Sequence, residues 1–349
     1  MRNLPLESLR GISAVLIVML HFKNDSIWHK NNLILNSEVF VDFFFVLSGF
    51  VLCLRYKDNI NSLSNLFLFV KKRFLRIYPL HILTLSFFVI YNIVKIFLIN
   101  EFNLIIIHDT YTFIDFFKNI FLIHGISGSS YNLPSWSISV EFICYLIFGL
   151  LLFKKLFSKL LFPIVIFSFI IIYFQITDLI SKEYMNMSRC LFCFFLGCLS
   201  FCYKEFLIKK KSSNIIFIIS SLITILLVSY HKNFIFLIAP FFFSIIIISA
   251  YNLETKSTLF NLLTIKPLIF LGKISYGIYM IHFAVTIPLR HLLHYYFNYE
   301  IKNEFLIVGN LQGFLFYFLI FFICISLSYF SHKYFESIWR INHHHEYKQ

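Results

Sequence analysis

Long apolar stretches separated by short polar segments dominate the pattern of this chain. A membrane-spanning helix needs about 20 mostly apolar residues, and several stretches meet this requirement. We expect ten transmembrane helices near residues 9–25, 37–55, 77–99, 134–153, 159–177, 189–203, 214–230, 233–251, 267–289 and 305–331. Residues 111–125 are too short and too polar to cross, and are expected to lie as an amphipathic segment at the membrane surface. The pattern therefore predicts an all-α integral membrane protein.

Composition agrees with this class. The chain is 59% hydrophobic and only 13% charged, against about 25% charged residues in soluble domains. The apolar run at the N-terminus lacks a cleavage site and is followed by further spans, so it is expected to be a retained first helix rather than a signal peptide. We assign residues 1–340 to one multipass transmembrane domain and residues 341–349 to a short cytoplasmic tail, in which His343, His344 and His345 are solvated.

The distribution of Lys and Arg fixes the expected orientation. With ten spans and the N-terminus inside, 21 of the 30 Lys and Arg residues fall on the cytoplasmic side. This asymmetry follows the positive-inside rule, so both termini are expected to be cytoplasmic. The net charge of +13 then reflects topology and contact with anionic lipid. The sequence holds no soluble basic domain for a nucleic acid, and no nucleic-acid partner is expected.

The cysteines give no metal site. All seven cysteines lie in apolar stretches, as small buried residues do. Cys190 and Cys193 form a C-x-x-C motif, but no second pair or nearby carboxylate completes a ligand set. No metal is predicted.

Two ionisable residues share one face of the first span. Arg10 and His21 are eleven residues apart, which is about three helical turns and about 16 Å. Arg10 is expected near the cytoplasmic interface and His21 in the outer half of the membrane. Ionisable groups inside a membrane are costly and usually functional.

Three further ionisable residues reach a similar depth: Asp42, Glu141 and His282. A carboxylate oriented on a histidine would hold its tautomer and raise its basicity, as a general base requires. Each residue alone also has a structural interpretation. A histidine can hydrogen-bond between helices, Asp42 can be a satisfied core acid or part of a proton relay, and Glu141 can pair with a cation.

A basic segment lies on the inner side. Arg73 and Arg76 are one turn apart if the segment is helical, and Lys72 is adjacent. Such a pair of guanidinium groups suits bidentate binding of phosphate. The alternative is ordinary positive-inside sequence.

These motifs, in this order, resemble the acyltransferase-3 family of multipass bacterial membrane acyltransferases, which modify cell-surface glycans. The matching motifs run from near residue 5 to near residue 340. They are R-x10-H within "LRGISAVLIVMLH", "VDFFFVLSGFVL", "RFLRIYP", "SWSISVEFICYL", "LGKISYGIYMIHF" and "YFES". Family members often have Glu-Pro where this chain has Glu336-Ser337, which leaves the role of Glu336 open. Many relatives carry a C-terminal SGNH-type domain, and we expect the form without it here.

The resemblance implies an O-acetyltransferase of the bacterial cytoplasmic membrane. Acetyl-CoA would be the donor, and the acceptor a hydroxyl of lipopolysaccharide, capsule, exopolysaccharide or a lipid-linked sugar. Succinyl or another acyl group stays open, as does a homo-oligomer. Direct transfer is preferred over an acyl-histidine intermediate. The implied roles are catalytic for His21, Glu141 and Asp42, donor-binding for Arg10, Lys72, Arg73 and Arg76, and channel-lining for Trp136, Ser137, Ser275, Tyr279 and His282. Ser275 and Tyr279 could equally hold the oxyanion or join helices.

Two other functions fit the same composition. A transporter or flippase of anionic or glycan substrates would suit ten helices with a polar centre, but the two halves share no motif order that would indicate inverted repeats. A non-catalytic scaffold of a polysaccharide assembly machine would tolerate changes at His21.

Overall fold

A computed structural model describes residues 3–102, 111–230 and 234–341. Its helices are α1 (Leu4–His21), α2 (Asn32–Leu35), α3 (Phe40–Tyr56), α4 (Leu63–Phe102), α5 (Phe113–Ile120), α6 (His124–Ser127), α7 (Trp136–Phe153), α8 (Phe157–Ile176), α9 (Met185–Leu207), α10 (Ser213–Tyr230), α11 (Ile235–Tyr251), α12 (Thr258–Leu263), α13 (Lys266–Tyr295), α14 (Asn310–Phe330) and α15 (Ser337–Ile341). Short turns are η1 (Ser37–Val39), η2 (Leu133–Ser135), η3 (Lys210–Ser212) and the π-helical η4 (Ser331–Glu336). Strands β1 (Ile301–Lys302) and β2 (Phe305–Leu306) form a small antiparallel hairpin.

The predicted membrane class is confirmed. Within the described residues, nine helical segments are long and apolar enough to cross a membrane. Helix α11, with 17 residues, is a further apolar helix at the position of the predicted span 233–251. Many apolar side chains of α8, α10 and α14 face outward, for example Phe167, Leu226 and Phe318, as expected of helices in contact with lipid chains. The tail 342–349, with its three histidines, lies outside the described residues.

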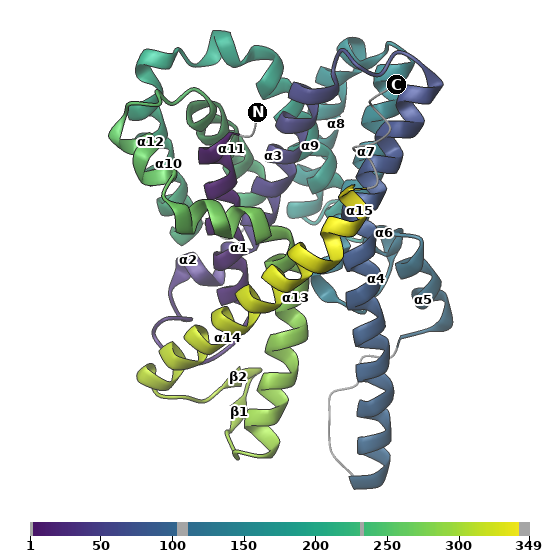
Figure 1. The fold of residues 1–349 in the computed structure, drawn as a ribbon, viewed down its shortest axis with the longest axis vertical. Helices are drawn as coiled ribbons and strands as arrows, with labels where there is room; N and C mark the ends of the chain where they lie inside the picture. The colour runs from purple at the N-terminus through teal and green to yellow at the C-terminus, as the bar shows by residue number, and fades with distance from the viewer. Residues whose placement is uncertain (1–2, 103–110, 231–233, 342–349) are drawn as a thin grey trace.

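Helices α4 and α13 extend well beyond their predicted spans. Helix α4 has 40 residues and continues through Pro79, so the basic segment around Arg73 is helical. Helix α13 has 30 residues. Proline is tolerated inside transmembrane helices because neighbouring groups satisfy the freed backbone carbonyl. In Figure 1 both helices run toward the same end of the molecule, where the β1–β2 hairpin lies beside the end of α13.

The predicted amphipathic segment contains two short helices. Helix α5 begins with a capping box between Thr112 and Asp115, which satisfies free backbone N–H groups at its start. Phe113 and Ile114 are exposed, whereas Asp115 and Asn119 are buried. The apolar residues of α5 therefore point away from the protein, which is the arrangement a helix needs to lie at a membrane surface.

Glycines bring two pairs of helices into close contact. Helix α1 packs most extensively on α13, and α3 on α9. A Cβ at Gly272 would collide with the carbonyl oxygen of Glu7 in α1. A Cβ at Gly49 would collide with Phe194, and one at Gly197 with Val46. Small residues at such contacts let membrane helices gain van der Waals packing where no hydrophobic driving force joins them.

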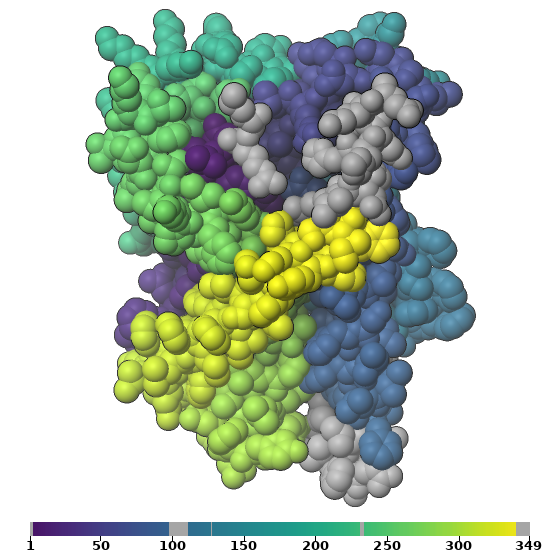
Figure 2. Space-filling view, in the orientation of Figure 1, coloured from purple at the N-terminus to yellow at the C-terminus, as the bar shows by residue number. Residues whose placement is uncertain are grey.

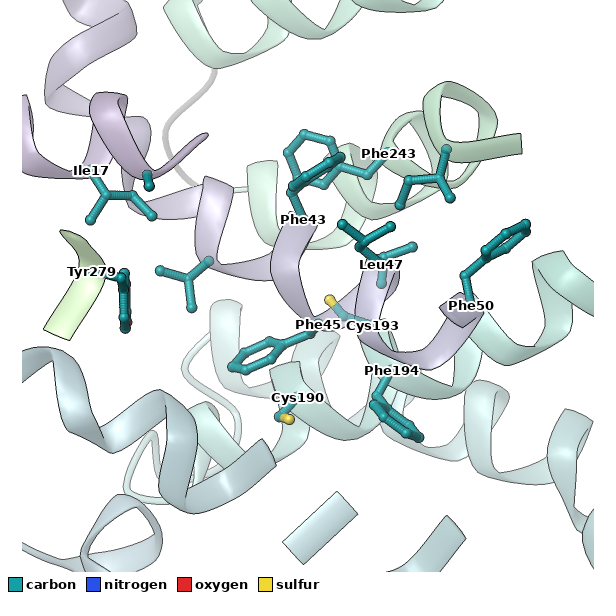
Figure 3. Close-up of a cluster of buried hydrophobic side chains, with 14 of the residues drawn as sticks. Ile17, Phe43, Phe45, Leu47, Phe50, Cys190, Cys193, Phe194, Phe243 and Tyr279 are labelled. Atoms are coloured by element: carbon teal, nitrogen blue, oxygen red, sulfur yellow. The ribbon is translucent and has the colours of Figure 1, made fainter. Parts of the chain in front are cut away.

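The core lies between α3, α9 and α11. Figure 3 shows Phe43 and Leu47 of α3 close to Phe243 of α11, with Cys193 of α9 beside them. The ring centroids of Phe43 and Phe243 are 5.5 Å apart in an edge-to-face contact. On another face, α14 and α15 form a diagonal band across α13 and α4, which Figure 2 shows as a continuous surface. This packing holds α1 between α3 and α13, and so positions Arg10 and His21.

Candidate functional site: a histidine pair and an arginine cluster

The contact between α1 and α13 joins two of the predicted site residues. His21 is the last residue of α1, and His282 lies in the middle of α13. Nδ1 of His21 lies 3.2 Å from Nε2 of His282, and the ring of Phe283 meets His21 edge-on at 4.8 Å. His282 is fully buried, whereas His21 is half-buried. The structure therefore brings together laterally two histidines that the sequence placed only at a similar depth.

The hydrogen bonds of the pair fix the tautomers of both neutral rings. A carbonyl oxygen only accepts, so Nδ1 of His282, 2.6 Å from the carbonyl oxygen of Tyr279, carries a proton. Its Nε2 is then an acceptor. Nδ1 of His21, 2.9 Å from the carbonyl oxygen of Ile17, carries a proton for the same reason and also faces the acceptor nitrogen of His282. The lone pair of His21 is therefore on Nε2.

Nε2 of His21 is left available. It makes no hydrogen bond within the described residues, and it is not among their buried unpartnered atoms. A half-buried imidazole with an anchored Nδ1–H and an open Nε2 has the geometry of a general base.

The expected hydrogen bond from His21 to a carboxylate is not found among the described residues. Asp42 faces α9 instead, because α3 packs on α9. Glu141 accepts a hydrogen bond of 2.6 Å from Tyr145, one turn along α7. A backbone carbonyl and a second imidazole take the place expected for the acid, so the catalytic roles of Asp42 and Glu141 stay predictions.

A buried ion network, missed by the sequence analysis, surrounds Asp42. Nε of Arg189 donates to Oδ1 of Asp42 at 3.2 Å, and its Nη1 donates to Oε1 of Glu38 at 2.8 Å. The guanidinium group lies 4.0 Å from the ring centroid of Phe236 and 5.5 Å from that of Trp136. The Arg189 side chain is only 3% exposed. Arg189 was not among the sequence-predicted site residues, although its place at the start of the predicted span 189–203 was the available signal.

A further buried histidine lies near the same end of α1. His29, in the loop after α1, has its Nδ1 3.0 Å from the hydroxyl of Tyr317 and 3.2 Å from the carbonyl oxygen of Met19. Burial lowers the pKa of His29, which keeps its ring neutral at physiological pH. This residue was not among the sequence-predicted site residues.

The predicted donor-binding arginines converge at the other end of α1. Arg10 lies 3.5 Å from Glu7, and the charges of Arg76 and Glu141 also act on it. Arg73 and Arg76, one turn apart on α4, act on each other. Nη2 of Arg73 donates to the hydroxyl of Tyr56 at 3.3 Å, while its Nε is buried without a partner.

This arginine cluster, made of Arg10, Arg73 and Arg76, is suited to an anion. Three guanidinium groups repel one another unless negative charge lies among them, and an unpartnered buried N–H calls for an acceptor. Lys72, half-buried beside Arg73, adds to the positive charge. Phosphate groups offer both the charge and the acceptor oxygens that guanidinium groups bind in pairs.

The predicted channel residues fall into two groups. The hydroxyls of Ser137 and Tyr279 are 2.8 Å apart, and each lies 3.0 Å from the carbonyl oxygen of Pro134. They tie α7 to α13. Ser275 donates to the carbonyl oxygen of Gly272 within its own helix. The hydroxyls of Ser137 and Tyr279 join two helices and that of Ser275 is bonded within α13, so the channel-lining and oxyanion roles of these residues stay predictions. Trp136 contacts Arg189 and Phe45.

No cluster of side chains suited to binding a metal ion is found among the described residues. Residues 3–102, 111–230 and 234–341 hold no group of three or more His, Cys, Asp or Glu side chains placed to bind a metal ion.

Comparison with known proteins identifies the family. A family model described as an acyltransferase domain, that of the acyltransferase 3 family, matches residues 3–333. A curated protein of Rhizobium radiobacter, named protein 2 in picA locus, is 36% identical over 98 residues, which are 26% of this chain and 47% of that protein. The chain thus covers about half the length of this relative. No solved structure matches the chain. The chain belongs to the acyltransferase 3 family and has the helices of a multi-pass membrane protein.

Proposed function

We propose that this acyltransferase moves an acetyl group from cytoplasmic acetyl-CoA to a hydroxyl of an extracytoplasmic surface glycan, with His21 as general base. The observation that carries the proposal is the geometry of α1. An open imidazole nitrogen stands at one end of the helix and the arginine cluster at the other. The two are about 16 Å apart along the helix axis.

The two parts of the donor would bind at these two ends of α1. The polyanionic nucleotide of acetyl-CoA cannot enter hydrocarbon, so its phosphates would stay on Arg10, Lys72, Arg73 and Arg76. The thin pantetheine arm would extend toward His21 and present the thioester there. Glu141 is hydrogen-bonded by Tyr145 and acts electrostatically on Arg10, so we place it with the arginines rather than beside the base.

The transfer step uses the open nitrogen of His21. The acceptor hydroxyl gives its proton to Nε2 as its oxygen attacks the thioester carbonyl. The tetrahedral intermediate collapses with cleavage of the C–S bond, and the proton passes from His21 to the departing CoA sulfur. The products are an O-acetyl sugar and CoA. His282, which accepts the Nδ1–H of His21, is a positioning residue that holds the ring as its charge develops.

The orientation and the location are part of the proposal. Both termini would be cytoplasmic, as the Lys and Arg distribution favours, and the bacterial relative supports the bacterial cytoplasmic membrane. The acceptor is expected among lipopolysaccharide, capsule, exopolysaccharide and lipid-linked sugars.

The test compares His21→Ala with the unchanged protein at equal expression. Surface glycans from cells with and without the gene are analysed by mass spectrometry for acetyl additions, and purified protein in proteoliposomes is assayed for CoA release. We expect the additions to depend on the gene and to be lost in His21→Ala. An active His21→Ala protein would contradict the assignment of the base. Arg73→Ala should weaken acetyl-CoA binding, and unchanged affinity would contradict the donor site alone.

A further inference from the structure

The strongest feature outside the histidine pair and the arginine cluster is the carboxylate of Glu38. It lies in η1, directly after Ser37, whose hydroxyl donates to the carbonyl oxygen of Leu16 at 3.0 Å. Leu16 and His21 belong to the same helix, so η1 is fixed to the end of α1 that carries His21. The charge of Glu38 acts on both His21 and Tyr279. Glu38 is therefore a charged neighbour of the proposed base.

Glu38 is held on one side and open on the other. Its Oε1 accepts from Nη1 of Arg189 at 2.8 Å, and no hydrogen bond to Oε2 is found within the described residues. The side chain is 51% exposed, whereas Arg189 is 3% exposed. Arg189 is itself fixed by Asp42 and by the ring of Phe236. A rigid, buried cation thus presents one carboxylate oxygen outward.

The charge around Glu38 is net negative. One guanidinium group, that of Arg189, faces two carboxylates, those of Asp42 and Glu38. The guanidinium is enclosed, so an approaching molecule meets the carboxylate of Glu38 and not the cation beneath it. The two lysines that follow α1 are also paired, Lys23 with Glu304 at 2.6 Å and Lys30 with Asp25 at 3.9 Å.

We propose that Glu38, clamped by Arg189, binds a hydroxyl of the acceptor next to His21, and that the acceptor ring at this position is an uncharged sugar. This inference rests on the proposed function and names its acceptor class. A carboxylate oxygen accepts hydrogen bonds from sugar hydroxyls and repels carboxylates, so a uronic or other acidic ring is disfavoured. Glu38 is a specificity-determining residue, and Arg189 is the residue that positions it.

The first test measures binding without turnover. Purified protein is mixed with three neutral methyl glycosides, the glucoside, the galactoside and the N-acetylglucosaminide, and with methyl glucuronide and methyl galacturonide. Thermal unfolding midpoints are recorded without acetyl-CoA. We expect at least one neutral glycoside to raise the midpoint and neither uronide to do so. No response to any neutral glycoside, or an equal response to a uronide, would overturn the proposal.

The second test uses Glu38→Gln with Glu300→Gln as the matched control. The amide introduced by Glu38→Gln keeps an oxygen for Arg189, so the unliganded midpoint should not change, while Glu300 is exposed beside the β1–β2 hairpin. Losing a hydrogen bond to a charged group should weaken the response to the neutral glycoside about tenfold or more. If Glu38→Gln keeps the full response to the neutral glycoside, or if Glu300→Gln loses as much of that response, the role of Glu38 is contradicted.

The experiments can contradict the acceptor site and the proposed acetyl transfer independently of each other. The binding assays need no acyl transfer, so a glycoside response that depends on Glu38 in a protein without transferase activity would uphold the acceptor site and reject the chemistry. Once the acceptor is known, Glu38→Gln should raise its KM and leave the KM for acetyl-CoA unchanged. A rise in both would indicate a purely structural role and contradict the assignment.

Discussion

Nδ1 of His21 donates toward Nε2 of His282 across 3.2 Å, joining residues 261 positions apart in the chain. The second imidazole occupies the place that a carboxylate takes in many catalytic histidine pairs. The bond leaves Nε2 of His21 as the basic nitrogen.

His282→Ala should lower kcat about tenfold to a hundredfold, because His21 would lose one of the two acceptors that hold its Nδ1–H. The KM for acetyl-CoA should stay unchanged, since the arginine cluster lies at the other end of α1. His282→Gln, whose amide oxygen can accept the same proton, should recover part of the rate. Steady-state kinetics in proteoliposomes give both constants. A parallel rise of KM, or no difference between the alanine and glutamine variants, would indicate a packing role only.

Arg189→Met should strongly destabilise the protein, because it leaves the fully buried Asp42 carboxylate without a counter-ion. Breaking one partner of a buried ion pair costs about 3–5 kcal/mol. The double variant Arg189→Met with Asp42→Asn removes both charges and should regain much of the loss. Unfolding midpoints in detergent measure the effect. If the double variant is no more stable than Arg189→Met alone, the ion pair is not the reason for the instability.

Gly197→Val should prevent α3 and α9 from packing, because the added atoms meet the backbone of Val46. We expect loss of the monodisperse peak in fluorescence-detected size-exclusion chromatography. Gly309→Ala is the control, since a Cβ there meets only Gln312 at 3.6 Å. Equal behaviour of the two variants would show that the close approach is not required.

The proposed orientation predicts which loops an impermeant thiol reagent reaches in intact cells. Lys302, in strand β1 between α13 and α14, and Asp58, in the turn between α3 and α4, are exposed and lie at opposite ends of the helices (Figure 1). Lys302→Cys should react in intact cells, and Asp58→Cys only after permeabilisation. The native cysteines are buried, apart from the half-buried Cys202, and the unchanged protein measures their background. The reverse pattern would place the termini outside.

The sequence predicted those parts of the site that depend on spacing within one helix. Arg10 and His21 share a face of α1, and Arg73 and Arg76 share one of α4, because helical geometry alone decides such relations. Contacts between helices could not be predicted from the sequence. Asp42 and Arg189 are 147 positions apart, and their pairing depends on how α3 packs on α9. The depth of Asp42 suggested His21 as its partner, but lateral packing selected Arg189 instead.

Helix length was underestimated for a related reason. The hydropathy of residues 77–99 marked a span, while the basic residues before it suggested a loop. In the structure the helix begins at Leu63 and passes through Pro79. Charged residues can belong to the end of a membrane helix when their side chains reach the interface. The polar residues before residue 77 therefore did not mark the start of α4.

The length of α4 has a consequence for the surrounding bilayer. Forty residues correspond to about 60 Å of helix, whereas the hydrocarbon layer is about 30 Å thick. Even a tilt of about 40°, the upper end of the usual range, leaves about 16 Å outside the hydrocarbon. The basic turns that carry Arg73 and Arg76 lie in the part of α4 that extends beyond the hydrocarbon layer at one end. A thicker bilayer would draw them toward the lipid tails, so the lipid acyl-chain length should change the affinity for the anionic donor.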